Sequence, residues 1–254
     1  KLRSHPHLNA YSIPFTMEAD SVNSAILTEQ ANDESIDLFV REIFREMTSK
    51  TGQKCTAIRR AFVPAALLDT VQTRLIEKLK KVVVGDPAQE GVSMGALASV
   101  KQKHDVAAKV EQLSQDAEIV FGSHLRQDFI LQVPNTEKSA CYPPTLLVCT
   151  APEQAQNIHK VEAFGPVVTL MPYTGLVQLA ELVARGEGSL VASIVRNTDE
   201  NIEQLLSKIA PWHGRVHILD AESAKESTGH GSPLPLLVHG GPGRAGGGEE
   251  LGGL

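Results

Sequence analysis

The sequence predicts an α/β domain in which helices cover both faces of a mostly parallel sheet. Short apolar segments rich in valine, isoleucine and leucine alternate with amphipathic segments of about 10–15 residues. This alternation is typical of parallel sheets and indicates a three-layer α/β/α arrangement. The chain has 254 residues, of which 42% are apolar, so it is long enough to bury a sizeable core.

The first 80 residues predict two strands and two amphipathic helices. Residues 10–16 favour a strand that enters a loop. Residues 32–50 predict a helix, because apolar residues recur at spacings of three and four behind an acidic first turn, and Gly52 is its expected end. Residues 57–63, A-I-R-R-A-F-V, predict the next strand, and residues 67–80 predict the second helix.

The rest of the chain continues the alternation of strands and helices. Short apolar runs bounded by turn residues predict the strands, and apolar residues at helical spacing predict the helices. Only the tail after Ala221, which is rich in Gly, Pro and Ser, is biased in composition. The predicted strands cover residues 81–87, 117–122, 129–133, 144–149, 166–173, 189–195 and 214–219, and the predicted helices cover residues 101–113, 176–184 and 199–209.

Net charge and cysteine content argue against several classes of protein. The formal net charge is −6 and no run of Lys or Arg stands out, so nucleic acid is not an expected partner. The longest apolar runs, such as L-P-L-L-V at 234–238, are too short to cross a bilayer, so no membrane partner is expected either. Three cysteines without a C-x-x-C pair fit a reducing cytoplasm better than a disulfide scaffold.

Two patterns look like ligand sites but lack the surroundings that such sites need. Residues 240–246, G-G-P-G-R-A-G, satisfy the G-x-G-x-x-G dinucleotide pattern. Only eight residues of the sequence follow Gly246 and several of them are glycine, which does not favour the helix that a dinucleotide site needs, so we expect a flexible or ligand-approaching loop. His159 and Glu162 could share one helical face as metal ligands. Their segment runs directly into F-G-P and no third ligand is near, so no metal site is expected.

Cys55 is the candidate nucleophile. It lies in T-G-Q-K-C-T-A-I-R-R, residues 51–60, in the loop between a predicted helix and a predicted strand. A single cysteine is usually an inert core residue, so a catalytic role needs support from other parts of the chain.

That support comes from several short motifs that follow one another along nearly the whole chain. In this order they resemble the aldehyde dehydrogenase superfamily, which implies that family's α/β catalytic-domain fold. The motifs are M-E-A-D-S at 17–21, G-Q-K-C at 52–55, G-D-P at 85–87 with M-G at 94–95, P-P-T-L-L at 143–147, E-A-F-G-P-V at 162–167, N-T-D at 197–199 and the glycine-rich tail.

The resemblance implies a role for each of four residues. Cys55 would attack the aldehyde carbon as a thiolate, with its own backbone N–H helping to hold the oxyanion, and a hydride would then leave to a nicotinamide. Glu18 would act as the general base that lets water hydrolyse the resulting thioester. Glu162 would hold the nicotinamide ribose, and Phe164 would pack near the nicotinamide. We therefore expect the Cys55 sulfur to be deprotonated and reachable, and the cofactor to be NADP or NAD.

The catalytic glutamate segment departs from the family pattern. The usual E-L-G-G is E-A-D-S here, so Asp20 and Ser21 replace two glycines that let the backbone approach the site. This variant and the H-G-G-P-G-R-A-G-G-G tail resemble the aldehyde dehydrogenase domain of phenylacetic acid degradation proteins. That branch implies a semialdehyde substrate formed after ring opening of a coenzyme A thioester, with NADP preferred over NAD.

The ends of the sequence suggest a piece of a longer protein. Residues 1–17 are expected to be a remnant of the cofactor-binding domain, residues 18–232 the catalytic domain, and residues 233–254 a truncated glycine-rich segment. The family's phosphate-binding G-x-T-x-x-G loop is absent, so we expect this chain to bind NAD(P) poorly and to be inactive alone. The intact protein is expected to be a homo-oligomer.

Two alternatives remain open at this stage. Coenzyme A could accept the acyl group in place of water, although Glu18 is a base that only hydrolysis needs. The chain could also be a non-catalytic scaffold module, although both Cys55 and Glu162 are present. In each case Cys141 and Cys149 are expected to be structural.

Overall fold

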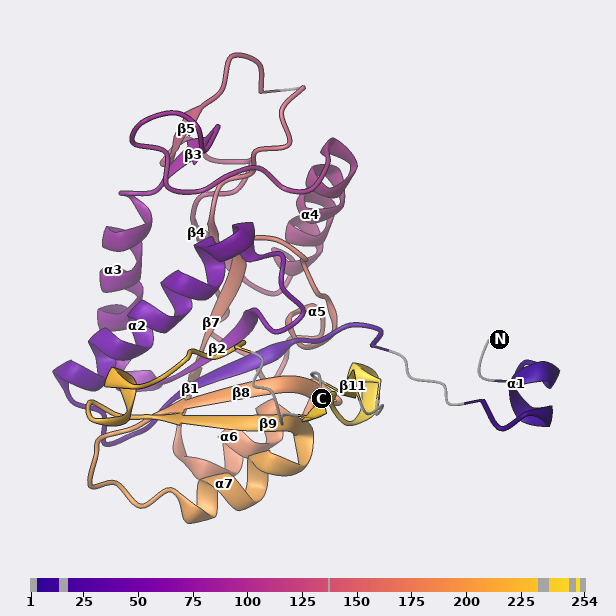
Figure 1. Ribbon diagram of the computed structural model, residues 1–254. Coiled ribbons are helices and arrows are strands. Elements are labelled where there is room, and N and C mark those ends of the chain that lie inside the picture. Colours follow the sequence, from indigo (N-terminus) through magenta and orange to yellow (C-terminus); the bar gives the residue numbers. More distant parts are fainter. Residues whose placement is uncertain (1–3, 14–17, 137, 233–237, 247–249, 252–254) are drawn as a thin grey trace.

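A computed structural model describes residues 4–13, 18–136, 138–232, 238–246 and 250–251. Its centre is a seven-stranded sheet with the strand order β4-β6-β7-β2-β1-β8-β9 (Figure 1). Every neighbouring pair is parallel except β4 and β6, which are antiparallel at one edge. The predicted mostly parallel sheet is confirmed. The strands are β1 (Asn23–Leu27), β2 (Ile58–Pro64), β4 (Glu118–Phe121), β6 (Thr145–Val148), β7 (Val167–Tyr173), β8 (Ser189–Val195) and β9 (His213–Leu219).

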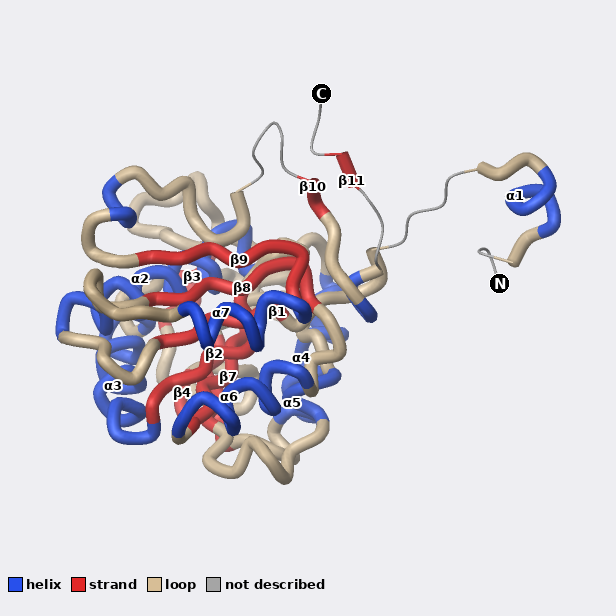
Figure 2. Tube along the Cα trace, turned by 90° about the horizontal axis from the view of Figure 1, so that it is seen from below, coloured by secondary structure: helices blue, strands red, loops and turns tan. Residues whose placement is uncertain are grey.

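Helices cover both faces of this sheet and complete three layers (Figures 1 and 2). One face packs against α2 (Asp33–Thr48) and α3 (Leu68–Leu79). The opposite face packs against α4 (Val100–Leu113) and three shorter helices. These three are α5 (Asn157–Lys160), α6 (Gly175–Ala184) and α7 (Glu203–Ile209).

The central strands are buried on both faces because each face has its own apolar core. Every residue of β1, β2 and β8 is buried. Side chains alternate between the two cores, as a strand requires. Ile26 and Phe62 belong to the core beneath α6 and α7, whereas Ala61 and Val63 belong to the core beneath α2 and α3.

The central strand β1 was not predicted from the sequence. Its five residues, N-S-A-I-L, begin with two polar residues and are too short to show a period. Both polar side chains are buried, and Asn23 and Ser24 each have hydrogen-bond partners that remove the cost of burial. Tertiary hydrogen bonding therefore replaces the apolar pattern that normally identifies a buried strand.

The strand predicted at residues 10–16 is wrong for the part that the structure describes. Ala10 is the last residue of the short helix α1 (Pro6–Ala10), and residues 11–13 form a turn, while residues 14–16 lie outside the described residues. Pro6 is preorganised for a first helical position, and the His5 ring accepts a hydrogen bond from the His7 N–H at 3.3 Å. These local signals favour a helical turn over the predicted strand.

Several small elements surround the main sheet. The predicted strands at residues 81–87 and 129–133 form a separate parallel pair, β3 (Val83–Gly85) and β5 (Ile130–Gln132). The tail contains the antiparallel pair β10 (Val238–His239) and β11 (Glu250–Leu251). The 3-10 turns are η1 (Ser49–Gly52), η2 (Ala65–Leu67), η3 (Ala210–Trp212), η4 (Ser223–Lys225) and η5 (Gly243–Ala245).

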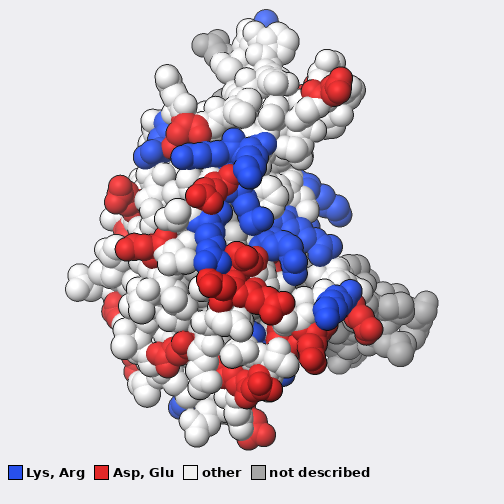
Figure 3. Space-filling view, turned by 90° about the vertical axis from the view of Figure 1, so that its left-hand side faces the viewer, with Lys and Arg blue, Asp and Glu red and all other residues white. Residues whose placement is uncertain are grey.

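The surface on the α2 and α3 side carries charges of both signs. Figure 3 shows a band of basic side chains across this face with acidic side chains along its border. Arg74 of α3, for example, pairs with Asp33 and Asp37 of α2. Among the described residues, none of the helices combines the length and the apolar character that a membrane span requires.

Phe62 offers a test of the two-core arrangement. It is fully buried at the middle of the sheet, so Phe62→Ala should lower the free energy of unfolding by about 3–5 kcal/mol in urea denaturation. The control Val177→Ala removes an exposed side chain and should change that free energy by less than about 0.5 kcal/mol. Equal effects of the two substitutions would contradict the assignment of Phe62 to the core.

Candidate functional site

The residues singled out from the sequence come together at one edge of the sheet. Glu18 precedes β1, Cys55 precedes β2 and Glu162 precedes β7. Because β7, β2 and β1 are parallel neighbours, the segments before them meet at the amino ends of the strands. The candidate site therefore lies at the edge opposite to the carboxyl ends, where open α/β sheets usually bind ligands.

The loop that carries Cys55 begins with a tight change of direction. Lys50, Thr51 and Gly52 all have positive φ angles, of 52°, 55° and 66°. A Cβ atom on Gly52 would lie 2.3 Å from the carbonyl oxygen of Gly165. The nucleophile loop thus touches the E-A-F-G-P segment backbone to backbone, and glycine is required at this contact.

Cys55 is partly buried beside an acidic neighbour. Its side chain packs against Leu190, Val191 and Ala245. Burial, together with the charge of Glu18 and a hydrogen bond to that carboxylate, raises the pKa of the Cys55 thiol from 9.0 to about 11. The sulfur is therefore a protonated thiol at neutral pH, which corrects the expectation of a thiolate. A nearby proton acceptor is needed, and the Glu18 carboxylate is in place.

Glu162 is held between two segments of the site. Its Oε2 accepts a hydrogen bond from the Ser21 N–H at 3.1 Å. Its Oε1 lies 3.6 Å from Arg59 Nε, which is an ion pair but too long for a hydrogen bond. Burial raises the pKa of Glu162, and the Arg59 charge opposes that shift. Oε1 is buried and has no hydrogen-bond partner among the described residues, so it can accept a further donor.

The Arg59 guanidinium joins the nucleophile loop to the E-A-F-G-P segment. Nη2 donates to the Gly52 carbonyl at 2.8 Å, and Nη1 donates to the Gly165 carbonyl at 2.6 Å. The guanidinium also lies over the Phe164 ring, 5.6 Å from its centre. The side chain is only 5% exposed, and burial lowers the pKa of Arg59 while the Glu162 carboxylate supports its charge.

Asn23 fixes the same loop from the other side. Its Nδ2 donates to the carbonyl oxygens of Cys55 at 2.8 Å and Ala57 at 3.0 Å. Its Oδ1 accepts from the Ser21 hydroxyl at 2.7 Å and from the Val191 N–H at 3.0 Å. All four bonds are at normal length, so this buried amide is fully satisfied. The segment that carries Glu18 is thereby linked directly to the backbone of Cys55.

Sequence reasoning did not identify Arg59 or Asn23 as site residues. Arg59 was visible only as half of a basic pair in a predicted strand, and Asn23 as the last residue of E-A-D-S-V-N. Their partners are mainly backbone carbonyl and N–H groups, which carry no sequence signature. A charged residue inside an otherwise apolar strand was the one available signal, since buried arginine requires partners.

The two decoy patterns have structural explanations. His159 is buried, with Nδ1 3.3 Å from Arg60 Nη1 and Nε2 2.9 Å from the Pro152 carbonyl, and burial lowers its pKa to about 4. The glycine-rich segment forms only the turn η5 within residues 240–246. A Cβ on Gly241 would lie 2.4 Å from the Ser189 carbonyl, so this glycine allows a close approach to the backbone of β8.

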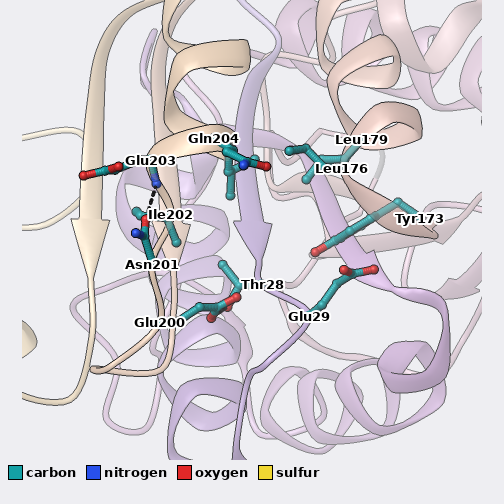
Figure 4. Close-up of a pocket in the computed structure, with 11 residues that line it drawn as sticks. Thr28, Glu29, Tyr173, Leu176, Leu179, Glu200, Asn201, Ile202, Glu203 and Gln204 are labelled. Carbon is teal, nitrogen blue, oxygen red and sulfur yellow. Dashed lines mark hydrogen bonds between the residues drawn. The ribbon is translucent and has the colours of Figure 1, made fainter.

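A separate cavity of about 440 Å³ lies at the carboxyl edge of the sheet (Figure 4). Its wall includes Thr28 after β1, Tyr173 at the end of β7 and the start of α7. Thr28 Oγ1 donates to Glu200 at 2.5 Å, and the Gly175 N–H donates to Glu29 at 2.9 Å. None of the sequence-predicted site residues lines this cavity.

Comparison with known proteins gives one family for nearly the whole chain. The aldehyde dehydrogenase family profile matches residues 7–234. The 3,4-dehydroadipyl-CoA semialdehyde dehydrogenase of Aromatoleum evansii is 42% identical over 244 residues, which are 95% of this chain and 47% of that protein. Protein MaoC of Klebsiella aerogenes is 45% identical over 162 residues, which are 63% of this chain and 46% of that protein. The chain spans about half the length of these curated relatives.

Solved structures confirm the predicted fold. A betaine aldehyde dehydrogenase from Staphylococcus aureus, solved with NAD⁺, has a TM-score of 0.75 and 20% identity, covering 93% of this chain and 44% of that one. A 3,6-anhydro-L-galactose dehydrogenase has a TM-score of 0.74 and 22% identity, covering 92% and 45%. At these identities the similarity establishes the fold.

Arg59 should be far more important for stability than an exposed arginine in an ion pair. Arg59→Met leaves Glu162 as an unpaired buried charge and should lower the free energy of unfolding by about 3–5 kcal/mol. Arg74→Met breaks two ion pairs at the surface of α2 and α3 and should cost less than about 1 kcal/mol. Similar costs in chemical denaturation would show that Arg59 does not hold the two loops together.

The raised pKa of Cys55 can be measured by alkylation. The rate at which iodoacetamide modifies Cys55, followed by peptide mass spectrometry, should rise with pH to a midpoint near 11. Glu18→Gln removes a negative charge and should move the midpoint to lower pH. Glu111→Gln, an exposed carboxylate paired with His124, should leave it unchanged. A midpoint near 9 in both the unaltered chain and Glu18→Gln would refute the Cys55–Glu18 contact.

Proposed function

Because this chain belongs to the aldehyde dehydrogenase family, we propose that the protein oxidises an aldehyde to a carboxylic acid with NAD(P), using Cys55 as nucleophile and Glu18 as general base. The observation that carries this proposal is the hydrogen bond between the Cys55 thiol and the Glu18 carboxylate. A thiol beside a base is the arrangement that nucleophilic catalysis requires.

The first step is proton transfer within this pair. Glu18 takes the thiol proton as the Cys55 sulfur attacks the aldehyde carbon, which gives a thiohemiacetal on Cys55. The backbone N–H of Cys55 is proposed to donate to the oxygen that becomes negative. Asn23 supports this geometry, because its amide holds the Cys55 carbonyl and so fixes the orientation of the adjacent backbone.

Glu162 and Phe164 are the residues proposed to hold the nicotinamide end of the cofactor. Glu162 Oε1 is a buried acceptor without a hydrogen-bond partner among the described residues, and a ribose hydroxyl is a donor that fits it. Phe164 adjoins the same carboxylate through Arg59 and offers a partly buried aromatic ring. When bound, the oxidised nicotinamide accepts the hydride that leaves the thiohemiacetal carbon.

Glu18 then serves the second half of the reaction. Loss of the hydride leaves a thioester on Cys55. Glu18, after it has released the thiol proton to solvent, takes a proton from the water that attacks the thioester and returns it to the departing sulfur. The products are a carboxylic acid and the regenerated Cys55 thiol. The presence of a carboxylate beside the sulfur favours water over coenzyme A as the acyl acceptor, since transfer to a thiol needs no hydrolytic base.

The proposed substrate is a semialdehyde linked to coenzyme A, with NADP favoured over NAD, in the breakdown of aromatic compounds. The support is the relative from Aromatoleum evansii, whose name specifies 3,4-dehydroadipyl-CoA semialdehyde. The E-A-D-S form of the glutamate segment also supports this substrate, because it resembles the aldehyde dehydrogenase domain of phenylacetic acid degradation proteins.

The cysteine assignment can be tested in the full-length protein. Cys55→Ala should abolish NAD(P)-dependent aldehyde oxidation, a loss of at least about 10⁴-fold, because the thiohemiacetal and the thioester both form on the Cys55 sulfur. Cys149→Ala removes a buried thiol from the core and should retain most of the activity. Comparable rates in the two variants would exclude Cys55 as nucleophile, and acyl-CoA as the main product would favour the acylating alternative.

A further inference from the structure

Asp20 and Arg244 form an ion pair at the rim of the site. Arg244 Nε lies 2.7 Å from Oδ1 of Asp20, and Nη2 lies 2.5 Å from Oδ2, so the contact is bidentate. Arg244 also donates to the carbonyl oxygens of His159 at 3.2 Å and Lys160 at 2.6 Å, and its side chain is 16% exposed. A guanidinium with this many partners defines one orientation of the carboxylate.

The two partners are close neighbours of the reacting pair along the chain. Asp20 is two residues after Glu18 and directly before Ser21, whose N–H donates to Glu162. Arg244 directly precedes Ala245, which packs with Leu190, Val191 and Cys55. The ion pair therefore connects the segment that carries Glu18 to the segment that covers Cys55.

Arg244 is itself fixed to the sheet through the glycine-rich segment. Its N–H donates to the Glu187 carbonyl at 3.0 Å. Gly243 has a φ of 57°, and a Cβ there would lie 2.0 Å from the same carbonyl oxygen. This close approach holds the Arg244 backbone against the residues that lead into β8, so Asp20 pairs with an anchored group.

We propose that Asp20 and Arg244 are positioning residues, whose ion pair holds the glutamate segment so that the Glu18 carboxylate stays against the Cys55 thiol. This inference rests on the proposed function. It also gives a role to a side chain that stands where the E-L-G-G pattern has glycine.

The direction in which the pKa of the Cys55 thiol shifts when Arg244 is removed separates positioning from a direct charge effect. Cys55 interacts with the Glu18 carboxylate and, when ionised, with the Arg59 and Arg215 guanidinium groups. If Arg244 acted on Cys55 through its charge, its removal would raise the pKa of the thiol. If Arg244 acts by holding Glu18 in place, its removal lowers that pKa, because the carboxylate that disfavours the thiolate moves away.

The experiment follows alkylation of Cys55 by iodoacetamide against pH in a set of variants. Arg244→Gln should move the midpoint down by about 1 unit, toward the value of Glu18→Gln, and isosteric Asp20→Asn should move it in the same direction. Arg244→Lys keeps one charged donor, so its midpoint should lie between those of Arg244→Gln and the unaltered chain. The control is Arg126→Gln, which breaks the 2.8 Å ion pair between Arg126 and Asp128. This pair is remote from the site in sequence, so the midpoint of Cys55 alkylation should not change.

The double variant Arg244→Gln/Glu18→Gln distinguishes positioning from general loosening. If the ion pair acts through Glu18, the double variant has the midpoint of Glu18→Gln alone. A further fall in the double variant overturns the inference, because it would mean that Cys55 has simply become more hydrated. An unchanged or raised midpoint in Arg244→Gln also overturns it, while a shift in Glu18→Gln leaves the proposed function standing. No shift in Glu18→Gln would instead reject the Cys55–Glu18 pair.

Discussion

The buried guanidinium of Arg59 joins the parts of the candidate site that come from distant positions in the chain. It donates to the carbonyl of Gly52 in the nucleophile loop and to the carbonyl of Gly165, and it balances the charge of Glu162. Two loops that meet backbone to backbone leave carbonyl oxygens that must find donors away from water. One planar group with five N–H donors can satisfy both and still support a carboxylate. The relative position of Cys55 and Glu162 therefore depends on Arg59, a residue that takes no part in the proposed reaction.

The location of the site follows from parallel strand order together with where the motifs fall along the chain. Glu18, Cys55 and Glu162 each precede a strand, and those strands are neighbours, so the three residues share the amino edge. The usual rule for open α/β sheets points to the carboxyl edge, where a cavity between α6 and α7 does exist. This cavity and the fold rule alone would thus have pointed to the carboxyl edge. The chemical identity of the side chains favours the amino edge, which is the edge that the proposed function uses.

Helices and apolar strands were predictable because their patterns are local. The helix expected at residues 32–50 is observed as α2 and η1, since its apolar stripe faces one core. The strand β1 escaped prediction because Asn23 and Ser24 satisfy their polar groups through residues far away in sequence. The pairing of Cys55 with Glu18 was expected from motif order, whereas the protonated state of the sulfur was not. Burial sets that state, and burial is a property of the folded chain.

The most direct test of the account is to map the acyl group during turnover. Full-length Glu18→Gln protein would be mixed with a semialdehyde and oxidised nicotinamide cofactor, quenched in acid, digested and analysed by mass spectrometry. The account predicts that, at a pH high enough for solvent to deprotonate the thiol without Glu18, the acyl mass remains on the Cys55 peptide and is absent from Cys141 and Cys149, because the sulfur then reacts while the base for hydrolysis is missing. Release of acid at the unaltered rate, with Cys55 unmodified, would contradict it.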